Sequence, residues 1–347
     1  MNKADLNRFF RHGHSCRGAG YLRFLLMFVV CFWNYGFPEP TGIVSDLCGF
    51  AAPAFFIFSG FFVLSDEAEN RQKQIERKIK RTSLWLLCMI IFYVIVNIAF
   101  CMIKHVSVTF TLRTAFGFFA MNLWFLPIGS GIWFIHALLY AYIVIYIAER
   151  LHWMKYYKVV MILLFIFMLL SGEFAGLIDF NFLGYSYIPG NWLTRALPYL
   201  LFGMFMRENP EFFMEIRPRV NLMLFVLGGA LAYGEIHLLS RMGGLIYMGH
   251  MVGYGIMAFA LCNLALSLPK LPESHIAYYD TALSGLIYAF MDPAYYLIWF
   301  AIGESHYSIF IHFGGMIALV LSILLAFSLK ESWLAKKCFS RRPIETF

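Results

Sequence analysis

Charged residues are scarce in this sequence: Asp, Glu, Lys and Arg make up 14% of its 347 residues, against 61% hydrophobic residues. A soluble domain carries about 25% charged residues, so this deficit excludes one or two ordinary soluble domains. The 38 Phe, 20 Tyr and 8 Trp exclude a disordered or fibrous chain, because such chains have few bulky side chains. The long apolar runs are typical of a polytopic helical membrane protein, and they far exceed the roughly ten alternating residues of a membrane β-strand.

The sequence also lacks the patterns of a disulfide framework or a metal centre. Its seven cysteines are scattered, no two of them form C-x-x-C, and no H-E-x-x-H is present. We therefore expect the cysteines to pack in apolar surroundings, and we expect no metal cofactor.

Ten apolar stretches predict an all-α integral membrane fold with about ten transmembrane helices. They cover roughly residues 19–36, 46–65, 82–103, 128–148, 157–171, 192–207, 219–236, 245–268, 282–302 and 305–328. The ninth stretch is the weakest, because Asp292-Pro293 interrupts it. We expect a short N-terminal segment over 1–18, one transmembrane domain over 19–329 and a basic tail over 330–347.

The Lys and Arg residues indicate the orientation of the chain. If the N-terminus is cytoplasmic, the inner side holds 23 of the 27 Lys and Arg residues. The outer side then keeps only Lys104, Arg113, Arg195 and Arg241. Because positive residues concentrate in cytoplasmic loops, both termini are predicted to be cytoplasmic. This topology accounts for the net charge of +7, so a nucleic-acid partner is not indicated.

The first predicted span presents two polar side chains on one helix face. Arg23 stands where the chain enters the membrane, and Asn34 follows eleven residues later. In an α-helix this spacing places them within about 20° of each other and about 16 Å apart along the axis. An Arg at this position also suits simple snorkelling to the interface, and the sequence leaves both interpretations open.

Two segments after the first span have both a structural and a functional interpretation. Ser59-Gly60 lies in the aromatic stretch 52–64, where small residues let another helix approach closely. The basic run 71–81, "RQKQIERKIKR", falls in the cytoplasmic loop predicted over 66–81. Positive-inside charge explains this run, but clustered Lys and Arg also suit a polyanionic ligand such as a nucleotide.

Three later segments follow in the sequence: "LWFLPIGSGIWFIHALLYAY" over 123–142, "LPYLLFGMFMR" over 197–207 and "GESHYSIFIHF" over 303–313. Each alone could be structural, but the order of all these segments along the chain is specific. With these segments in place, the chain resembles the membrane-bound acyltransferase 3 family from about residue 21 to 329. That family includes O-acetyltransferases of bacterial surface polysaccharides. The resemblance implies a multi-pass protein of the bacterial cytoplasmic membrane, an acyl-CoA donor (above all acetyl-CoA) on the cytoplasmic side, and a glycan or other hydroxyl acceptor at the outer face.

The resemblance also implies catalytic residues, with one departure. Arg23 fits the basic residue of the family's first helix, but Asn34 stands where the family carries a histidine that is thought to be the catalytic base. Asparagine cannot take up a proton at neutral pH, although it can orient a hydroxyl.

The donor site that the resemblance implies lies near the basic run. The family carries Arg-x-x-Arg there, and the best match runs from Lys78 to Arg81, with lysine at the first position. Arg77 offers a neighbouring guanidinium, and Ser59 of the FFxxSGF segment is expected at the same acyl-CoA site.

Histidines are the candidates to replace the missing base. His136, His250 and His312 all fall in the outer halves of their predicted spans. A lone histidine there can simply hydrogen-bond to a neighbouring helix, but ionisable residues inside a membrane are functional candidates by default. His312 is the strongest of the three, because Glu304 and His306 lie close to it in the sequence.

Two functions from different classes follow from these observations. The first is transmembrane acyl transfer to a hydroxyl of a surface polysaccharide. The second is a catalytically silent family member that acts as a polysaccharide exporter or assembly partner, for which Asn34 is the main argument. An ion-coupled transporter is a weaker third option, since paired acidic residues within the predicted spans are scarce.

Overall fold

The structure is a computed structural model, and it describes residues 17–38, 42–63, 68–108, 110–129, 131–172, 191–242, 251–268, 279–303 and 306–339, together with the single residues 174, 272 and 276. All regular elements in these ranges are helical, which confirms the all-α prediction. The main helices are α2 (Arg17–Tyr35), α4 (Ala51–Phe61), α5 (Ala68–Lys104), α6 (Leu112–Met121), α7 (Ile132–Arg150), α8 (Tyr157–Ser171), α9 (Leu197–Glu208), α11 (Pro218–Arg241), α12 (Val252–Leu266), α14 (Asp280–Ile298) and α15 (Tyr307–Leu329). Shorter elements are α3 (Ile43–Leu47), α10 (Pro210–Met214), α16 (Trp333–Phe339), the 3-10 turns η1 (Cys48–Phe50) and η2 (Trp153–Tyr156), and the π-helical turns η3 (Trp192–Ala196) and η5 (Trp299–Gly303).

Eight helical segments of the described chain are long and apolar enough to cross a membrane. They correspond to the predicted spans one to five, seven, nine and ten. The sixth predicted span is a π-helical turn followed by the short helix α9, and the eighth is the 15-residue helix α12. Residues 243–250, where the eighth span was predicted to begin, lie outside the described residues.

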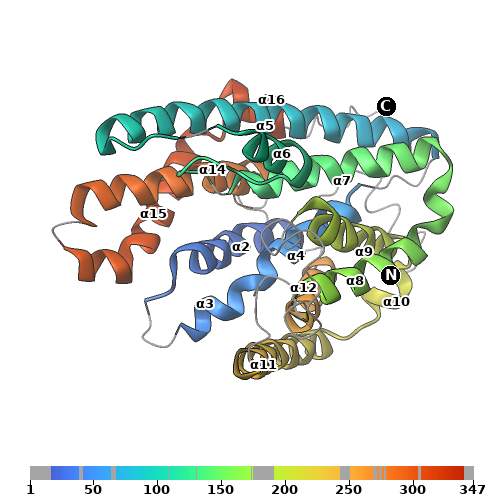
Figure 1. Ribbon diagram of the computed structural model, residues 1–347. Helices are drawn as coiled ribbons and strands as arrows, with labels where there is room; N and C mark the ends of the chain where they lie inside the picture. Colours follow the sequence, from blue (N-terminus) through green and yellow to red (C-terminus); the bar gives the residue numbers. More distant parts are fainter. Residues whose placement is uncertain are drawn as a thin grey trace.

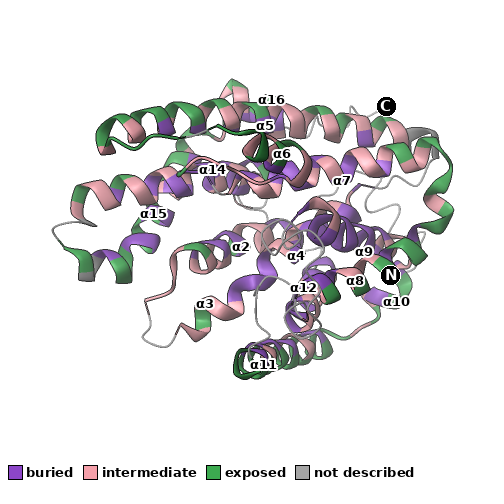
Figure 2. Ribbon diagram, viewed as in Figure 1, coloured by how far each residue is buried: buried purple, intermediate pink, exposed green. Residues whose placement is uncertain are grey.

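The outward faces of the bundle are apolar, as expected of a surface in contact with lipid. Figure 2 shows exposed residues along the outer sides of α5, α8 and α11 and a buried centre around α4, α9 and α12. Many of these exposed residues are large and apolar: Leu87, Ile91, Ile95, Ile98 and Met102 on α5, Val159, Ile162 and Leu163 on α8, and Leu222, Val226 and Leu227 on α11. A soluble protein rarely exposes such extended apolar faces, so we interpret the chain as a multi-pass membrane protein.

Helix α5 runs along one edge of the molecule, with α7 and α14 next to it and α2 and α4 towards the centre (Figure 1). Inside the bundle, α4 and α9 approach each other closely at two glycines. A Cβ atom added at Gly60 would lie 1.9 Å from the carbonyl oxygen of Leu200, and one added at Gly203 would lie 2.0 Å from that of Ile57. The prediction that Ser59-Gly60 admits a neighbouring helix is thereby confirmed, and the neighbour is α9.

The basic run forms a helix rather than a loop. Helix α5 is continuous over 37 residues and includes all of 71–81, so the prediction of a loop over 66–81 was wrong. This stretch has no Gly or Pro and consists of strong helix formers. Ile75 is completely buried and Trp85 nearly so, which anchors one face of the extended helix against the bundle.

The predicted interruption at Asp292-Pro293 is also absent, because α14 continues through Pro293. A proline inside a helix leaves the carbonyl four residues earlier without its usual partner. Here that carbonyl belongs to Ala289, and the Tyr93 hydroxyl of α5 donates a hydrogen bond to it at 2.9 Å. A neighbouring helix therefore supplies the missing donor, as membrane interiors require.

The sequence analysis assigned no element to the segment between the third and fourth spans. The fourth span begins at Ile132 rather than near 128, and the short helix α6 precedes it. Residues 122–129 are irregular, yet they are tied to the interior of α5, where the Asn97 amide donates to the Ile128 carbonyl at 2.7 Å and its oxygen accepts from the Ile128 N–H at 2.9 Å. Because Asn97 lies about two turns before the end of α5, this irregular backbone lies within the bundle, where protein groups satisfy it.

The bundle has two ends. The basic end is the one at which α2 begins, and it carries Arg23, Lys78, Arg150 and Arg207. The far end is the one at which α2 finishes, at Tyr35.

Candidate functional site

Arg23 lies on aromatic rings at the basic end of the bundle. Its guanidinium carbon is 5.4 Å from the ring centre of Phe58 and 5.0 Å from that of Phe62, both from the segment of α4. Its side chain is only partly exposed. A cation over an aromatic face is attracted by the ring, so Phe58 and Phe62 help to hold Arg23 at this position.

Two further cations and a hydroxyl pair surround this position. The Tyr142 hydroxyl of α7 lies near Ser59 of α4 and near Arg23, and the Ser59 hydroxyl donates to the Phe55 carbonyl at 2.8 Å. The Lys78 Nζ of α5 is 5.6 Å from the centre of the Tyr142 ring. On α9, the Arg207 guanidinium carbon is 5.5 Å from the centre of the Phe61 ring. Five helices thus place three cations and two hydroxyls around one aromatic wall.

The residues predicted for donor binding divide into two groups on α5. Lys78 lies one turn from the buried Ile75 and turns towards the bundle, whereas Arg77 is exposed on the solvent side. Arg81 is partly exposed. The structure therefore brings Arg23, Ser59 and Lys78 together, and it leaves Arg77 outside this group.

Two ion pairs lie at the same end of the bundle. Arg71 pairs with Glu149 at 3.4 Å, and Lys158 pairs with Glu208 at 3.7 Å. The cluster around Arg23 suits an anionic ligand, because clustered Lys and Arg bind phosphate groups through charge-assisted hydrogen bonds.

Asn34 is exposed at the far end of α2. Its amide nitrogen donates to the Val30 carbonyl of its own helix at 2.9 Å. Since α2 is continuous from Arg17 to Tyr35, Asn34 and Arg23 do lie on nearly the same helix face. The structure thus places the two predicted first-helix residues at opposite ends of one face, about 16 Å apart.

The predicted histidines differ in their surroundings. His136 is only 4% exposed, and its ring lies 4.9 Å from that of Phe118 and 4.6 Å from that of Tyr140. Its Nδ1 has no hydrogen-bond partner among the residues that the structure describes. His312 is exposed, on the side of α15 turned away from Phe310, which packs towards α14. His250 and Glu304 lie outside the described residues.

Sequence analysis missed a polar group at the far end, centred on Asp292 of α14. This carboxylate is 8% exposed and accepts a hydrogen bond from the Tyr35 hydroxyl of α2. Its second oxygen accepts from the Gly131 N–H at 3.4 Å. The Tyr288 hydroxyl, one turn earlier on α14, donates to the Gly131 carbonyl. The rule that ionisable residues inside a membrane are functional candidates would have found Asp292, but Asp292-Pro293 was read only as a break in the helix.

A second missed residue is Arg195, which the sequence placed among the outer-side cations. It is 3% exposed in the π-helical turn η3, and its guanidinium carbon lies 4.9 Å from the centre of the Trp133 ring. The preceding Asn191 caps this turn by accepting from the Leu193 N–H at 2.8 Å. Single π-helical turns are frequent at functional sites, and an aromatic-rich sequence gave no signal for one here.

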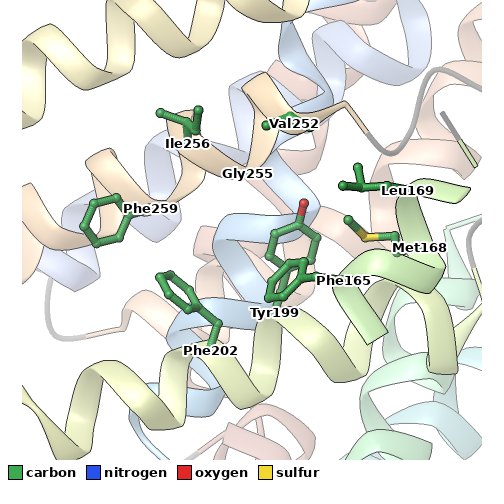
Figure 3. Close-up of a pocket in the computed structure, with 9 residues that line it drawn as sticks. All are labelled: Phe165, Met168, Leu169, Tyr199, Phe202, Val252, Gly255, Ile256 and Phe259. Atoms are coloured by element: carbon green, nitrogen blue, oxygen red, sulfur yellow. The ribbon is translucent and has the colours of Figure 1, made fainter. Parts of the chain in front are cut away.

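A separate cavity of about 280 Å³ lies between α8, α9 and α12. Figure 3 shows the rings of Phe165, Tyr199 and Phe202 facing Val252 and Ile256 across it. Its lining has no charged side chain, so it offers nothing to a phosphate group. On α9 the lining residues lie about a quarter turn from the face that packs on α4, which separates the cavity from the cluster around Arg23.

The described residues hold no group of three or more His, Cys, Asp and Glu side chains placed to bind a metal ion. The six described cysteines are free, and four of them are buried. A family model named acyltransferase 3 and described as an acyltransferase domain matches residues 18–330 of the chain. The chain matches no curated protein and no solved structure.

Proposed function

The chain belongs to the acyltransferase 3 family of membrane acyltransferases, and on this premise we propose that it moves an acyl group from acyl-CoA at its basic end to a hydroxyl group at its far end. The acceptor class that we propose is a bacterial surface polysaccharide or a related glycan. The acyl group is in the first place acetyl, and the membrane is the bacterial cytoplasmic membrane, with the basic end inside.

The observation that carries this proposal is the cluster around Arg23 at the basic end. Arg23, Lys78 and Arg207 lie there on aromatic rings, and clustered cations suit the several phosphate groups of CoA. The hydroxyl oxygens of Ser59 and Tyr142 can accept hydrogen bonds from the amide N–H groups of the pantetheine arm. We propose these five residues as the donor site, with Arg81 and Arg77 nearer the entrance.

The acyl group then has to travel along the bundle. Helix α7 begins after Gly131 at the far end and passes Tyr142 on its way to Arg150 at the basic end. Gly131 and Tyr142 are eleven positions apart, so they share a helix face and are separated by about 16 Å. We propose that the pantetheine arm follows this face between the helices and presents the thioester to the acceptor near the far end.

A silent exporter or assembly partner stays as the second candidate, because Asn34 occupies the family's histidine position. Such a protein would not need a binding site for CoA. Affinity for CoA therefore separates the two functions before any acceptor is known.

The test is calorimetric titration of CoA into the purified protein. We expect Lys78→Ala to weaken CoA binding about 10- to 100-fold, because one charge-assisted phosphate contact is worth roughly 1.5–3 kcal/mol. The matched control is Lys80→Ala, which removes the same charge from an exposed position on the same helix. No measurable CoA binding by the wild type, or equal losses in the two variants, would contradict the proposed donor site.

A further inference from the structure

Helix α5 carries its basic run on two different faces. Lys78 turns towards the bundle, where its Nζ is 5.6 Å from the centre of the Tyr142 ring. Lys80, two positions later, is exposed. At about 100° per residue, Lys80 lies roughly 160° away from Lys78 around the helix. The run therefore presents cations on a second face, away from the cluster around Arg23.

This second face continues into the surface of α5 that contacts lipid. Leu87, Ile91 and Ile98 follow Lys80 on the same side of the helix, and each is more than half exposed. Steps of seven, four and seven residues keep these four side chains within about 40° of one another. Figure 2 shows exposed residues along the outer side of α5. Lys80 therefore belongs to a face whose other members are in contact with the hydrocarbon chains of the membrane.

The length of the uncharged stretch of α5 places Lys80 at the membrane boundary. Between Arg81 and Lys104 the helix has 22 residues without a charge. They rise about 33 Å, close to the roughly 30 Å of the hydrocarbon core of a bilayer. Lys80 then lies just outside this core, in the layer of roughly 5–7 Å that holds the polar groups of the lipids on each side.

Helix α16 packs on α5 at the same level. The ring of Phe339 in α16 contacts that of Trp85 in α5, with the ring centres 4.7 Å apart. Trp85 lies five residues after Lys80, which is about 7.5 Å along the helix axis. The C-terminal residues of α16 therefore reach the edge of the hydrocarbon core next to Lys80.

The side chains of α16 are distributed as in a helix that lies in the membrane interface. Ala335 and Cys338 are buried, whereas Lys336 and Lys337 are exposed. The Lys337 Nζ lies 4.6 Å from the centre of the ring of Trp333, which is exposed as well. Exposed tryptophan and lysine side chains are enriched where a protein meets the headgroup layer.

We propose that Lys80 of α5 and Lys336 and Lys337 of α16 form a binding site for the headgroup of an anionic phospholipid in the leaflet at the basic end. The negative charge of the headgroup complements the three lysines. The acyl chains of the same lipid lie along the apolar face of α5 that begins at Leu87. One lipid molecule thus finds a matching surface for both of its parts, whereas a free phosphate ion would use the lysines alone.

The site is separate from the donor site and does not depend on acyl transfer. Lys78 and Arg23 lie on the bundle side of α5, and the three lysines of the lipid site lie on its outer side and on α16. Helix α5 thereby separates two anionic ligands that would otherwise compete for one basic run.

The experiment is native mass spectrometry of the purified full chain in a neutral detergent, which counts the lipid molecules bound. The lipids are phosphatidylglycerol, which is anionic, and phosphatidylcholine with the same acyl chains, which has no net charge. Three double variants are compared with the wild type: Lys80→Gln with Lys337→Gln, Lys80→Arg with Lys337→Arg, and Arg113→Gln with Arg241→Gln. The last pair is the matched control, because it removes two exposed cations at the far end.

We expect the wild type to bind phosphatidylglycerol more tightly than phosphatidylcholine. Each lysine near an anionic lipid surface strengthens binding about fivefold, so the lysine-to-glutamine pair should lose roughly 10- to 30-fold in affinity for phosphatidylglycerol. The lysine-to-arginine pair should keep most of this affinity, since it keeps the charges, and the far-end pair should keep it as well. Melting temperatures without added lipid should stay unchanged, because all these side chains are exposed.

Three results would overturn the proposal. The first is equal affinity of the wild type for the two lipids, and the second is an equal loss in the two glutamine pairs. The third is displacement of phosphatidylglycerol by inorganic phosphate at constant ionic strength, which would make the lysines a site for free phosphate. The affinity for CoA should stay unchanged in the Lys80→Gln, Lys337→Gln pair, and its loss would assign these lysines to the donor site instead.

Discussion

The two ends of the bundle hold their polar groups in opposite ways. At the basic end, Arg23 and Lys78 are partly exposed and lie on aromatic rings. At the far end, the carboxylate of Asp292 is buried and accepts hydrogen bonds from the Tyr35 hydroxyl and the Gly131 N–H. Aromatic rings hold cations by electrostatic attraction, whereas hydroxyl and N–H donors hold a buried carboxylate by hydrogen bonds.

This difference suggests a division of labour between the ends. The basic end would select its ligand by charge, so its affinity should fall as salt screens the cations. The far end would act by hydrogen bonding and proton transfer in a place from which bulk water is largely excluded, and salt should affect it little. The predictions below test each side of this comparison.

The largest expected effect comes from residue 34 at the far end. The change Asn34→His places a titratable group at the position that the family uses for its histidine. General-base catalysis contributes typically about 10²–10⁴-fold, so Asn34→His should raise the content of acyl esters in the outer glycans well above that of the wild type.

The control is Asn34→Gln, which keeps an amide at this position and should change the ester content little. An Asn34→His variant that folds and binds CoA but transfers no more than the wild type would show that the acceptor does not reach residue 34. The comparison would then lose its account of the far end.

A smaller effect is expected from Arg23 at the basic end. Arg23→Ala should weaken CoA binding by about 10- to 100-fold, and Arg23→Lys should recover only part of it, because lysine keeps the charge but not the planar guanidinium that lies on Phe58 and Phe62. Titrations of CoA at low and high salt test whether the basic end selects its ligand by charge, because salt should then weaken CoA binding. A loss of acyl transfer with unchanged CoA affinity would instead move Arg23 from the donor site to the chemistry.

The smallest effect is expected at His312, although sequence analysis placed it first among the candidate bases. Its side chain is exposed on the outward side of α15. Substitutions at such positions usually change stability by less than about 0.5 kcal/mol, so His312→Ala should keep its melting temperature and its ester content. His136→Ala is the contrast, since the ring of His136 is buried against Phe118 and Tyr140 and its loss should lower the melting temperature. Abolished transfer in His312→Ala would restore the histidine prediction and break the account of the far end.

Much of the fold could be predicted because hydropathy alone marks helices that must satisfy their backbone in lipid. The fifth predicted span, 157–171, coincides with α8. The errors arose where tertiary contacts override local signals. Proline at 293 predicts a break, but the Tyr93 hydroxyl of another helix removes the reason for one, and no sequence pattern links residues so far apart.

The candidate site, like the fold, could be predicted only in part. The clustering of Arg23, Ser59 and Lys78 was anticipated through the family resemblance, which supplied the link between separate segments. Asp292 and Arg195 were missed as site residues, because their surroundings are built from distant helices and from a π-helical turn that leaves no trace in hydropathy. A charged residue within an apolar stretch was the available signal for Asp292 and Arg195, but the sequence analysis applied this signal only to histidines.

Acyl transfer across the membrane is the central claim, and sealed membrane vesicles from the source cells test it most directly. Labelled acetyl-CoA is added outside inside-out vesicles, and the label is followed into glycans of the lumen that an impermeant glycosidase cannot reach. We predict label in the lumenal glycans of wild-type vesicles, none with the Lys78→Ala, Arg81→Ala double variant at low acetyl-CoA, and none in right-side-out vesicles until they are permeabilised. Label confined to glycans on the side of the added acetyl-CoA, or equal labelling in both vesicle orientations, would contradict the account.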